Sequence, residues 1–274
     1  MKPFIRWVNG KRRLLDDIKG LIGSVQFSHY YEPFVGGGAL FFDSIYAVPH
    51  SQISDVNIPL MDTYAAIKQN PDLVLGIISS LKNESYAAIK HEFNDKPKIG
   101  QCRTAALFLM LNHLCFNGLY RENKKGEFNV PIGKHGSTVL GTNRPRTMKD
   151  FPYESIMEAH IALRRTTIMA CSFARAMRDA RIASGSTLVF CDPPYFKEFS
   201  SYNKSGFSKA YHCDLACMAL ELRDKGAHVI VCGSDNADTR QIYGTPAKVI
   251  TLKRTVGAGK REDASEALYL FTPN

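Results

Sequence analysis

The chain has 274 residues, of which 45% are hydrophobic and 22% are charged, and its formal net charge is +9. This length can form one sizeable core, or one core with a smaller lobe, and the composition is that of a globular protein. No apolar run approaches the roughly 20 residues of a membrane span, and the N-terminal segment has no apolar stretch of signal-peptide length. We therefore expect a cytoplasmic protein, and its positive charge fits a polyanionic partner such as nucleic acid.

Seven cysteines are spread over the chain, and no two of them have C-x-x-C spacing. An odd number without this spacing argues against a disulfide framework and against a zinc site. We expect reduced thiols and no bound metal.

Strand patterns and helix patterns alternate at both ends of the chain. The sequence predicts a strand over 29–35, a helix over 39–47, a strand over 51–55 and a helix over 58–68. Further strands are predicted over 187–191, 227–232, 248–252 and 267–271, with a helix over 215–223. Such alternation is typical of an α/β fold with a mostly parallel sheet.

The middle of the chain breaks this rhythm. Apolar residues have helical spacing from about 71 to 116, and a polar, glycine-rich and basic stretch follows to about 146. We interpret residues 57–165 as a second, helical domain that is inserted into an α/β domain formed by residues 1–56 and 166–274.

A glycine-rich turn follows the first predicted strand, in the sequence Glu32-Pro33-Phe34-Val35-Gly36-Gly37-Gly38. Glycines there let the backbone approach a ligand at the carboxyl edge of a sheet. The spacing is not that of a dinucleotide site, and no phosphate-binding Lys-Ser/Thr follows. The ligand therefore need not carry phosphate, and a purely structural turn remains an alternative.

Asp55 ends the next predicted strand, about twenty residues further on. An acidic residue at this place can bind the ribose hydroxyls of a nucleoside. The alternative is a helix-capping role before Asn57; together with the glycine turn, the ribose role is favoured.

Asp192-Pro193-Pro194-Tyr195 follows the apolar strand 187–191 and is the most informative tetrapeptide in the chain. The amine of adenine is a poor nucleophile, because its lone pair is delocalised into the ring. A carboxylate and a backbone carbonyl that accept its two N–H bonds would localise this pair on nitrogen. The prolines stiffen the loop and Tyr195 offers a ring on which a base can stack. A proline-rich turn without function is the alternative.

Two further segments contain aromatic and basic residues together. Trp7 is the only tryptophan and could stack on a cofactor adenine, with Lys11 reaching a carboxylate, although a lone tryptophan is more often part of a core. Residues 116–131 combine turn residues, basic residues and aromatics, which suits a hairpin that enters a DNA groove. A solvated surface hairpin is the alternative.

These segments, in this order, resemble the Dam family of DNA adenine-N6 methyltransferases. The matching pieces are Arg6-Trp7-x-x-Gly10-Lys11, Glu32-Pro33-Phe34-Val35-Gly36-x-Gly38, Asp55-x-Asn57, Asn117-Gly118-Leu119-x-Arg121, Gly126-Glu127-Phe128-Asn129-Val130-Pro131 and Asp192-Pro193-Pro194-Tyr195. The last piece also occurs in other amino-methyltransferases, whereas the 117–131 block is more particular to this family.

The resemblance implies a Rossmann-like methyltransferase domain with an inserted helical target-recognition domain, which methylates adenine in double-stranded GATC sites after base flipping. It implies S-adenosylmethionine binding by Trp7, Lys11, Glu32, Phe34, Gly36, Gly38, Asp55 and Asp192. The flipped adenine would be bound by Asp192, Pro193, Pro194 and Tyr195. DNA contacts are implied for Arg6, Phe116, Asn117, Leu119, Arg121, Asn123, Asn129 and Pro131. Among these, Arg121 would read a guanine, Leu119 a thymine, and Phe116 would insert into the duplex.

The sequence departs from the family pattern in three respects. Arg6 replaces a frequent lysine, Asn9 replaces a usual glycine, and Tyr120 and Glu122 flank Arg121 in an unusual way. Two other functions compete with a DNA adenine methyltransferase: an amino-methyltransferase that acts on RNA or a protein amide, and a non-catalytic DNA-binding protein on a methyltransferase scaffold. The 117–131 block disfavours the first, and the intact Asp192 disfavours the second.

Overall fold

The computed structural model describes residues 1–8, 10–45, 47–95, 100–133, 147–195, 207–256 and 260–273, with the backbone alone at 44, 252–256 and 260–264. Asn9, one of the departures from the family pattern, lies outside these residues.

A seven-stranded sheet with strand order β3-β2-β1-β4-β5-β7-β6 forms the framework. Its strands are β1 (His29–Glu32), β2 (His50–Asp55), β3 (Thr166–Ala170), β4 (Thr187–Cys191), β5 (Ala227–Ser234), β6 (Lys248–Val256) and β7 (Lys260–Phe271). β1 runs parallel to β2 and β4, β4 runs parallel to β5, and β7 is antiparallel to β5 and β6. This confirms the predicted α/β class, with a Rossmann-like reversal of strand order at β1.

The register brings the carboxyl ends of four strands to one edge of the sheet. Glu32 lies opposite Ile53 of β2, and Cys191 lies opposite Val231 of β5. In open α/β sheets, ligands bind outside this edge, where the strand order reverses. The predicted strand 29–35 is too long: β1 ends at Glu32, directly before Pro33, which has no N–H to donate to a ladder.

The chain divides into two compact units. The first consists of Met1–Arg12, Val35–Ala47 and Asp55–Ala170, and the second of Arg13–Phe34, Val48–Ser54 and Cys171–Asn274. The predicted domain limits at 57 and 165 stay a prediction.

The described residues of the first unit include the α-helices α2 (Ile58–Gln69), α3 (Pro71–Leu81), α4 (Tyr86–Asn94), α5 (Gln101–Leu114) and α6 (Tyr153–Leu163). The helical middle of the chain is therefore confirmed. Asn57 and Ser85 cap α2 and α4 with their side chains, and Pro71 begins α3. α5 is buried from Ala105 to His113, which makes it the central helix of this unit.

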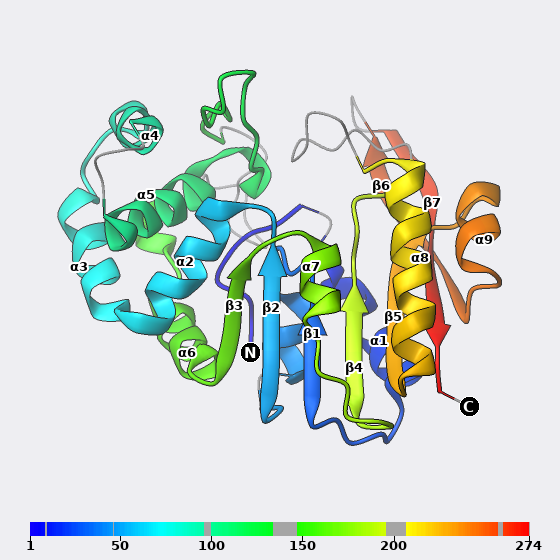
Figure 1. Cartoon of the computed structure of the whole chain (residues 1–274). Helices are drawn as coiled ribbons and strands as arrows, with labels where there is room; N and C mark the ends of the chain where they lie inside the picture. The colour runs from blue at the N-terminus through cyan, green and yellow to red at the C-terminus, as the bar shows by residue number, and fades with distance from the viewer. Residues whose placement is uncertain are drawn as a thin grey trace. The chain divides into compact units, whose positions relative to one another are not determined.

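The second unit has the helices α1 (Leu15–Ile22), α7 (Phe173–Arg178), α8 (Lys209–Asp224) and α9 (Ala237–Tyr243). α7 and α8 lie on one side of its strands and α1 on the other (Figure 1). Side chains of β4 and β5, among them Val189 and Val229, pack with Leu215 of α8 in one buried cluster. Strands covered on both faces read as continuous apolar runs, which is why the sequence predicts β4 and β5 so well.

Several elements differ from the sequence-based expectations. The helix predicted over 39–47 forms a π-helix at Phe41–Ile45, and the short elements β3, α1, α6, α7 and α9 were not predicted. A short 3-10 helix at Lys11–Leu14 precedes α1. None of the helices described here combines the length and apolarity that crossing a bilayer requires.

Candidate functional site

The glycine turn after β1 has no room for side chains. Gly36 and Gly38 have φ of +47° and +67°, in the left-handed region that favours glycine. A Cβ on Gly36 would lie 2.6 Å from two atoms of the Trp7 indole ring, and one on Gly37 would lie 2.9 Å from the Trp7 Cβ. The turn and Trp7 therefore fit together because residues 36 and 37 lack side chains.

Asp55 at the end of β2 holds this turn. Its carboxylate accepts the N–H of Gly36 at 3.2 Å and the N–H of Asn57 at 2.9 Å. The Tyr64 hydroxyl donates to the Gly36 carbonyl at 2.8 Å, so the turn is fixed from two sides. Burial raises the pKa of Asp55, while the backbone N–H donors oppose this shift. The side chain that caps α2 is Asn57, which accepts the N–H of Leu60, so the capping alternative for Asp55 is wrong.

The N-terminal segment is tied to α5 by a buried amide that the sequence analysis missed. Asn112 accepts the N–H of Arg6 at 2.9 Å and donates to the carbonyls of Arg6 and Gly118 at 2.8 and 3.2 Å. The Arg6 guanidinium donates to the His113 carbonyl at 3.1 Å, and Lys11 is only 4% exposed. The signal that could have found Asn112 is its place in an otherwise apolar run of α5.

The 192–195 loop follows β4 in the second unit. The Tyr195 side chain is 5% exposed, and its hydroxyl donates to the Glu266 carboxylate at 2.6 Å. Asp192 is partly exposed, whereas Cys191 before it is fully buried. Burial raises the pKa of the Cys191 thiol, which disfavours the thiolate and thus a covalent role for this cysteine.

Glu32 and Phe34 belong to the same unit as this loop. Glu32 is 3% exposed, and its carboxylate accepts the Tyr30 hydroxyl at 2.8 Å. The Phe34 ring stacks on Phe173, with 5.4 Å between the ring centroids. Because β1 and β4 are neighbours, the structure brings Glu32 and the start of the 192–195 loop to adjacent strand ends.

Residues 115–133 form the predicted hairpin in the first unit. Backbone bridges pair Cys115 with Ile132 and Glu122 with Phe128. The Arg121 Nε donates to the Asn129 side-chain oxygen at 2.7 Å, and the Asn129 N–H donates to the Arg121 carbonyl at 3.0 Å. The side chain of Arg121 is thus held by its partner across the hairpin.

Asn123 builds the turn of this hairpin. Its side-chain oxygen accepts the N–H groups of Lys125 and Glu127, and its amide donates to the Glu127 carboxylate at 2.7 Å. Gly126 has a φ of +79°, which the turn requires. The structure therefore gives Asn123 a turn-forming role.

Phe116 stands at the base of the hairpin and is 43% exposed. Its N–H donates to the Pro131 carbonyl at 3.0 Å, and Asn117 beside it has a φ of +54°. Asparagine tolerates this left-handed conformation better than most residues. The backbone at 116–118 thus holds a large aromatic ring where solvent reaches it.

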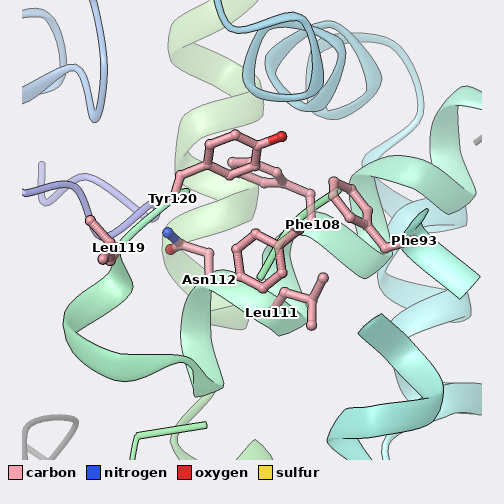
Figure 2. Close-up of a pocket in the computed structure, with 7 residues that line it drawn as sticks. Phe93, Phe108, Leu111, Asn112, Leu119 and Tyr120 are labelled. Atoms are coloured by element: carbon pink, nitrogen blue, oxygen red, sulfur yellow. The ribbon is translucent and has the colours of Figure 1, made fainter. Parts of the chain in front are cut away.

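A packed aromatic cluster joins residues of the hairpin to α4 and α5 (Figure 2). Tyr120 contacts Phe108 and Phe128, with 5.7 Å between ring centroids in each pair, and Phe93 contacts both phenylalanines. No water-sized space remains between these rings, Leu119 and their neighbours. Tyr120 also lies nearly parallel to Trp7, at 17°, with 6.5 Å between centroids. The hairpin therefore has a rigid base next to Trp7.

The fold and these features define a class of protein. The structure combines a Rossmann-like sheet with a glycine turn after β1, an acidic residue at the end of β2 and an Asp-Pro-Pro-Tyr loop after β4. This arrangement is typical of α/β enzymes that bind a ligand at the carboxyl edge of the sheet. The basic hairpin adds a surface suited to a polyanion.

Comparisons with known proteins assign the family. Residues 7–257 match the model of the D12 class N6 adenine-specific DNA methyltransferases, and the chain belongs to this family. The Type II methyltransferase M1.LlaDCHI of Lactococcus lactis subsp. cremoris is 30% identical over 89% of this chain and 84% of its own. A DNA adenine methylase of Vibrio cholerae is 31% identical over 100% of this chain and 97% of its own. The solved structure of SMU.472 complexed with SAH covers 99% of this chain and 55% of its own, at 11% identity and a TM-score of 0.40.

The protein is therefore an adenine-specific DNA methyltransferase, and its partner is DNA. This excludes an enzyme specific for RNA or a protein amide, and it excludes a DNA-binding protein without catalytic activity. The relatives include both Type II methyltransferases and DNA adenine methylases.

We predict that Gly36→Ala displaces Trp7 from the glycine turn. The added Cβ meets the indole ring, and the positive φ costs about 1–3 kcal/mol for a non-glycine residue. Trp7 is the only tryptophan, so its fluorescence and its quenching by iodide report the displacement directly. Gly76→Ala in α3 is the matched control, because nothing lies within 4 Å of its new Cβ. Unchanged emission and quenching in Gly36→Ala would show that Trp7 does not depend on this turn.

Proposed function

We propose that this enzyme transfers a methyl group from S-adenosylmethionine to N6 of adenine within GATC sites of double-stranded DNA, after flipping the base out of the helix. The observation that carries the proposal is the 192–195 loop, which follows β4 directly beside the end of β1, where the strand order reverses. The cytoplasmic location of the protein stays a prediction from the sequence, whether a bacterial host or a phage encodes it.

The chain's residues fit S-adenosylmethionine. The turn at 36–38 carries no side chains of its own. The Asp55 carboxylate has about four acceptor positions. It accepts the N–H groups of Gly36 and Asn57, with the Val56 backbone as a further neighbour, and can still accept a ribose hydroxyl. We assign cofactor binding to Trp7, Lys11, Glu32, Phe34, Gly36, Gly38, Asp55 and Asp192. When bound, the cofactor would supply the methyl group from its sulfonium and leave as a neutral thioether, and the methylated amine would lose one proton to solvent. Trp7 would stack on its adenine, and the Lys11 ammonium would pair with its carboxylate.

The 192–195 loop would activate the adenine amine. The Asp192 carboxylate and the Pro193 carbonyl accept its two N–H bonds, so that the nitrogen lone pair turns away from the ring system. The Tyr195 hydroxyl is engaged with Glu266, which leaves the ring of Tyr195 for contact with the base. Positioning then supplies most of the rate, since transfer to an oriented amine needs no covalent enzyme intermediate.

The hairpin would read the DNA sequence. Because Asn129 holds the Arg121 Nε, the two terminal nitrogens of the guanidinium remain as a pair of donors for guanine O6 and N7. Leu119 would contact a thymine methyl, and the exposed Phe116 would fill the space that the flipped adenine leaves. The remaining assigned DNA contacts are Arg6, Asn117, Asn123, Asn129 and Pro131.

We expect methyl transfer to a duplex that contains GATC and none to a duplex that differs only by GTAC. Labelled S-adenosylmethionine and nucleoside analysis measure the product. Label in N6-methyladenine on the first duplex alone supports the base, the cofactor and the site together. Label on both duplexes would contradict the GATC assignment. No label on either duplex would contradict either the cofactor or the recognition sequence. Calorimetry with S-adenosylmethionine distinguishes these two cases, because binding of the cofactor would leave only the recognition sequence wrong.

Asp192→Ala is expected to lower the single-turnover rate by a factor on the order of 10²–10³, because it removes a hydrogen bond that strengthens as the amine attacks. Affinity for GATC duplex should stay within a few-fold of the unmodified enzyme. Gel shift and rapid-quench assays on the full chain measure the two quantities. A parallel loss of DNA affinity would count against the assigned role.

Arg121→Ala is expected to relax sequence choice at one guanine by about 1–3 kcal/mol, or roughly 5- to 150-fold. The measurement is the ratio of kcat/KM on GATC to that on duplexes with this base pair changed. Lys125→Ala is the control, since this exposed turn lysine should affect salt dependence but not the ratio. Equal losses on all duplexes in Arg121→Ala would contradict base reading.

A further inference from the structure

A buried hydrogen bond between two side chains supports the 192–195 loop. The Tyr195 hydroxyl lies 2.6 Å from the Glu266 carboxylate, and the two side chains are 5% and 6% exposed. This distance is in the range of charge-assisted O–H···O hydrogen bonds. The hydroxyl is therefore directed into the protein, and the bond anchors the last residue of the loop.

Glu266 is itself fixed by the sheet. It lies in β7, between β5 and β6, opposite Ser234 of β5 and Ile250 of β6. Ser234 is the last residue of β5, so Glu266 lies towards the carboxyl edge from which the 192–195 loop emerges after β4. A side chain on a central strand is a more rigid support than one on a loop.

The residue before Tyr195 has a buried neighbour in α8. His212 lies near the Pro194 backbone, and its Nδ1 lies 2.7 Å from the Tyr243 hydroxyl. Burial lowers the pKa of His212 to about 4, so the ring is neutral near pH 7.

We propose that Glu266 is a positioning residue for methyl transfer: its carboxylate holds the Tyr195 hydroxyl and so fixes the 192–195 loop in the geometry that the reaction needs. The inference rests on the proposed role of this loop. Glu266 does not touch the adenine or the methyl group; it acts through Tyr195. A displacement of the loop by a fraction of an ångström would misplace both acceptors of the amine, and such errors lower rates steeply.

The test is a double-mutant cycle on the full chain with Tyr195→Phe, Glu266→Leu and the double variant, since leucine has no atom that accepts the Tyr195 hydroxyl. Single-turnover rates at saturating DNA and S-adenosylmethionine are measured together with dissociation constants and melting temperatures. Each single variant should lower the rate about 5- to 100-fold with dissociation constants within about twofold, and the double variant should lose no more than the worse single variant. Non-additive losses in the rate, without losses in binding, identify positioning.

Tyr31→Phe is the matched control, since the buried Tyr31 hydroxyl also has a partner, the Arg181 backbone, in the same unit. It should lower the melting temperature without lowering the rate. Tyr195→Phe removes a single oxygen atom and tests the same bond if Glu266→Leu fails to fold. A normal rate in Tyr195→Phe or in folded Glu266→Leu, or losses that multiply in the double variant, would overturn the inference. Full activity of Asp192→Ala would instead overturn the proposed role of the loop.

Discussion

The hydrogen bond between the Gly36 N–H and the Asp55 carboxylate is the contact on which the glycine turn after β1 depends. A chain that leaves a strand in a tight turn exposes backbone groups that need partners. Here a partner comes from the neighbouring parallel strand. Because β1 and β2 end at the same edge of the sheet, Asp55 at the end of β2 reaches the turn after β1. The same turn excludes any Cβ, and the indole of Trp7 occupies the space that side chains would fill.

Glu32, Glu266 and Asp192 lie near the ends of strands and differ in burial and in their hydrogen-bond partners. Glu32 and Glu266 are both buried, and each accepts a tyrosine hydroxyl, from Tyr30 and Tyr195. A buried carboxylate needs such a donor, because desolvation without one is costly. Asp192 is only partly buried. The burial pattern therefore separates two carboxylates that hold tyrosine hydroxyls from one that solvent reaches.

Features that depend on neighbouring residues can be predicted from the sequence, whereas contacts between residues far apart in the chain cannot. The strand 187–191 and the loop after it were predictable, since an apolar run and two prolines are local features. Glu266 and Asn112 were not, because their partners lie 71 and 106 residues away in the chain. A polar side chain inside an apolar strand or helix is a sign of such a partner, but the sequence does not say which residue it is. Short elements such as β3 and α7 were not predicted for another reason: a few residues are too short a segment to show a clear hydrophobic periodicity.

The spacing of the hairpin residues has a geometric cause. Arg121 and Asn129 are opposite each other because the Glu122–Phe128 bridge and the Asn123 turn set the register between them. A one-residue change in the turn would move every side chain of one strand to the other face. Arg121 would then lose the amide that holds its Nε, and Phe128 would leave the aromatic cluster under Tyr120. The length of the 121–129 segment is therefore as much a part of the proposed DNA recognition as the identity of its residues.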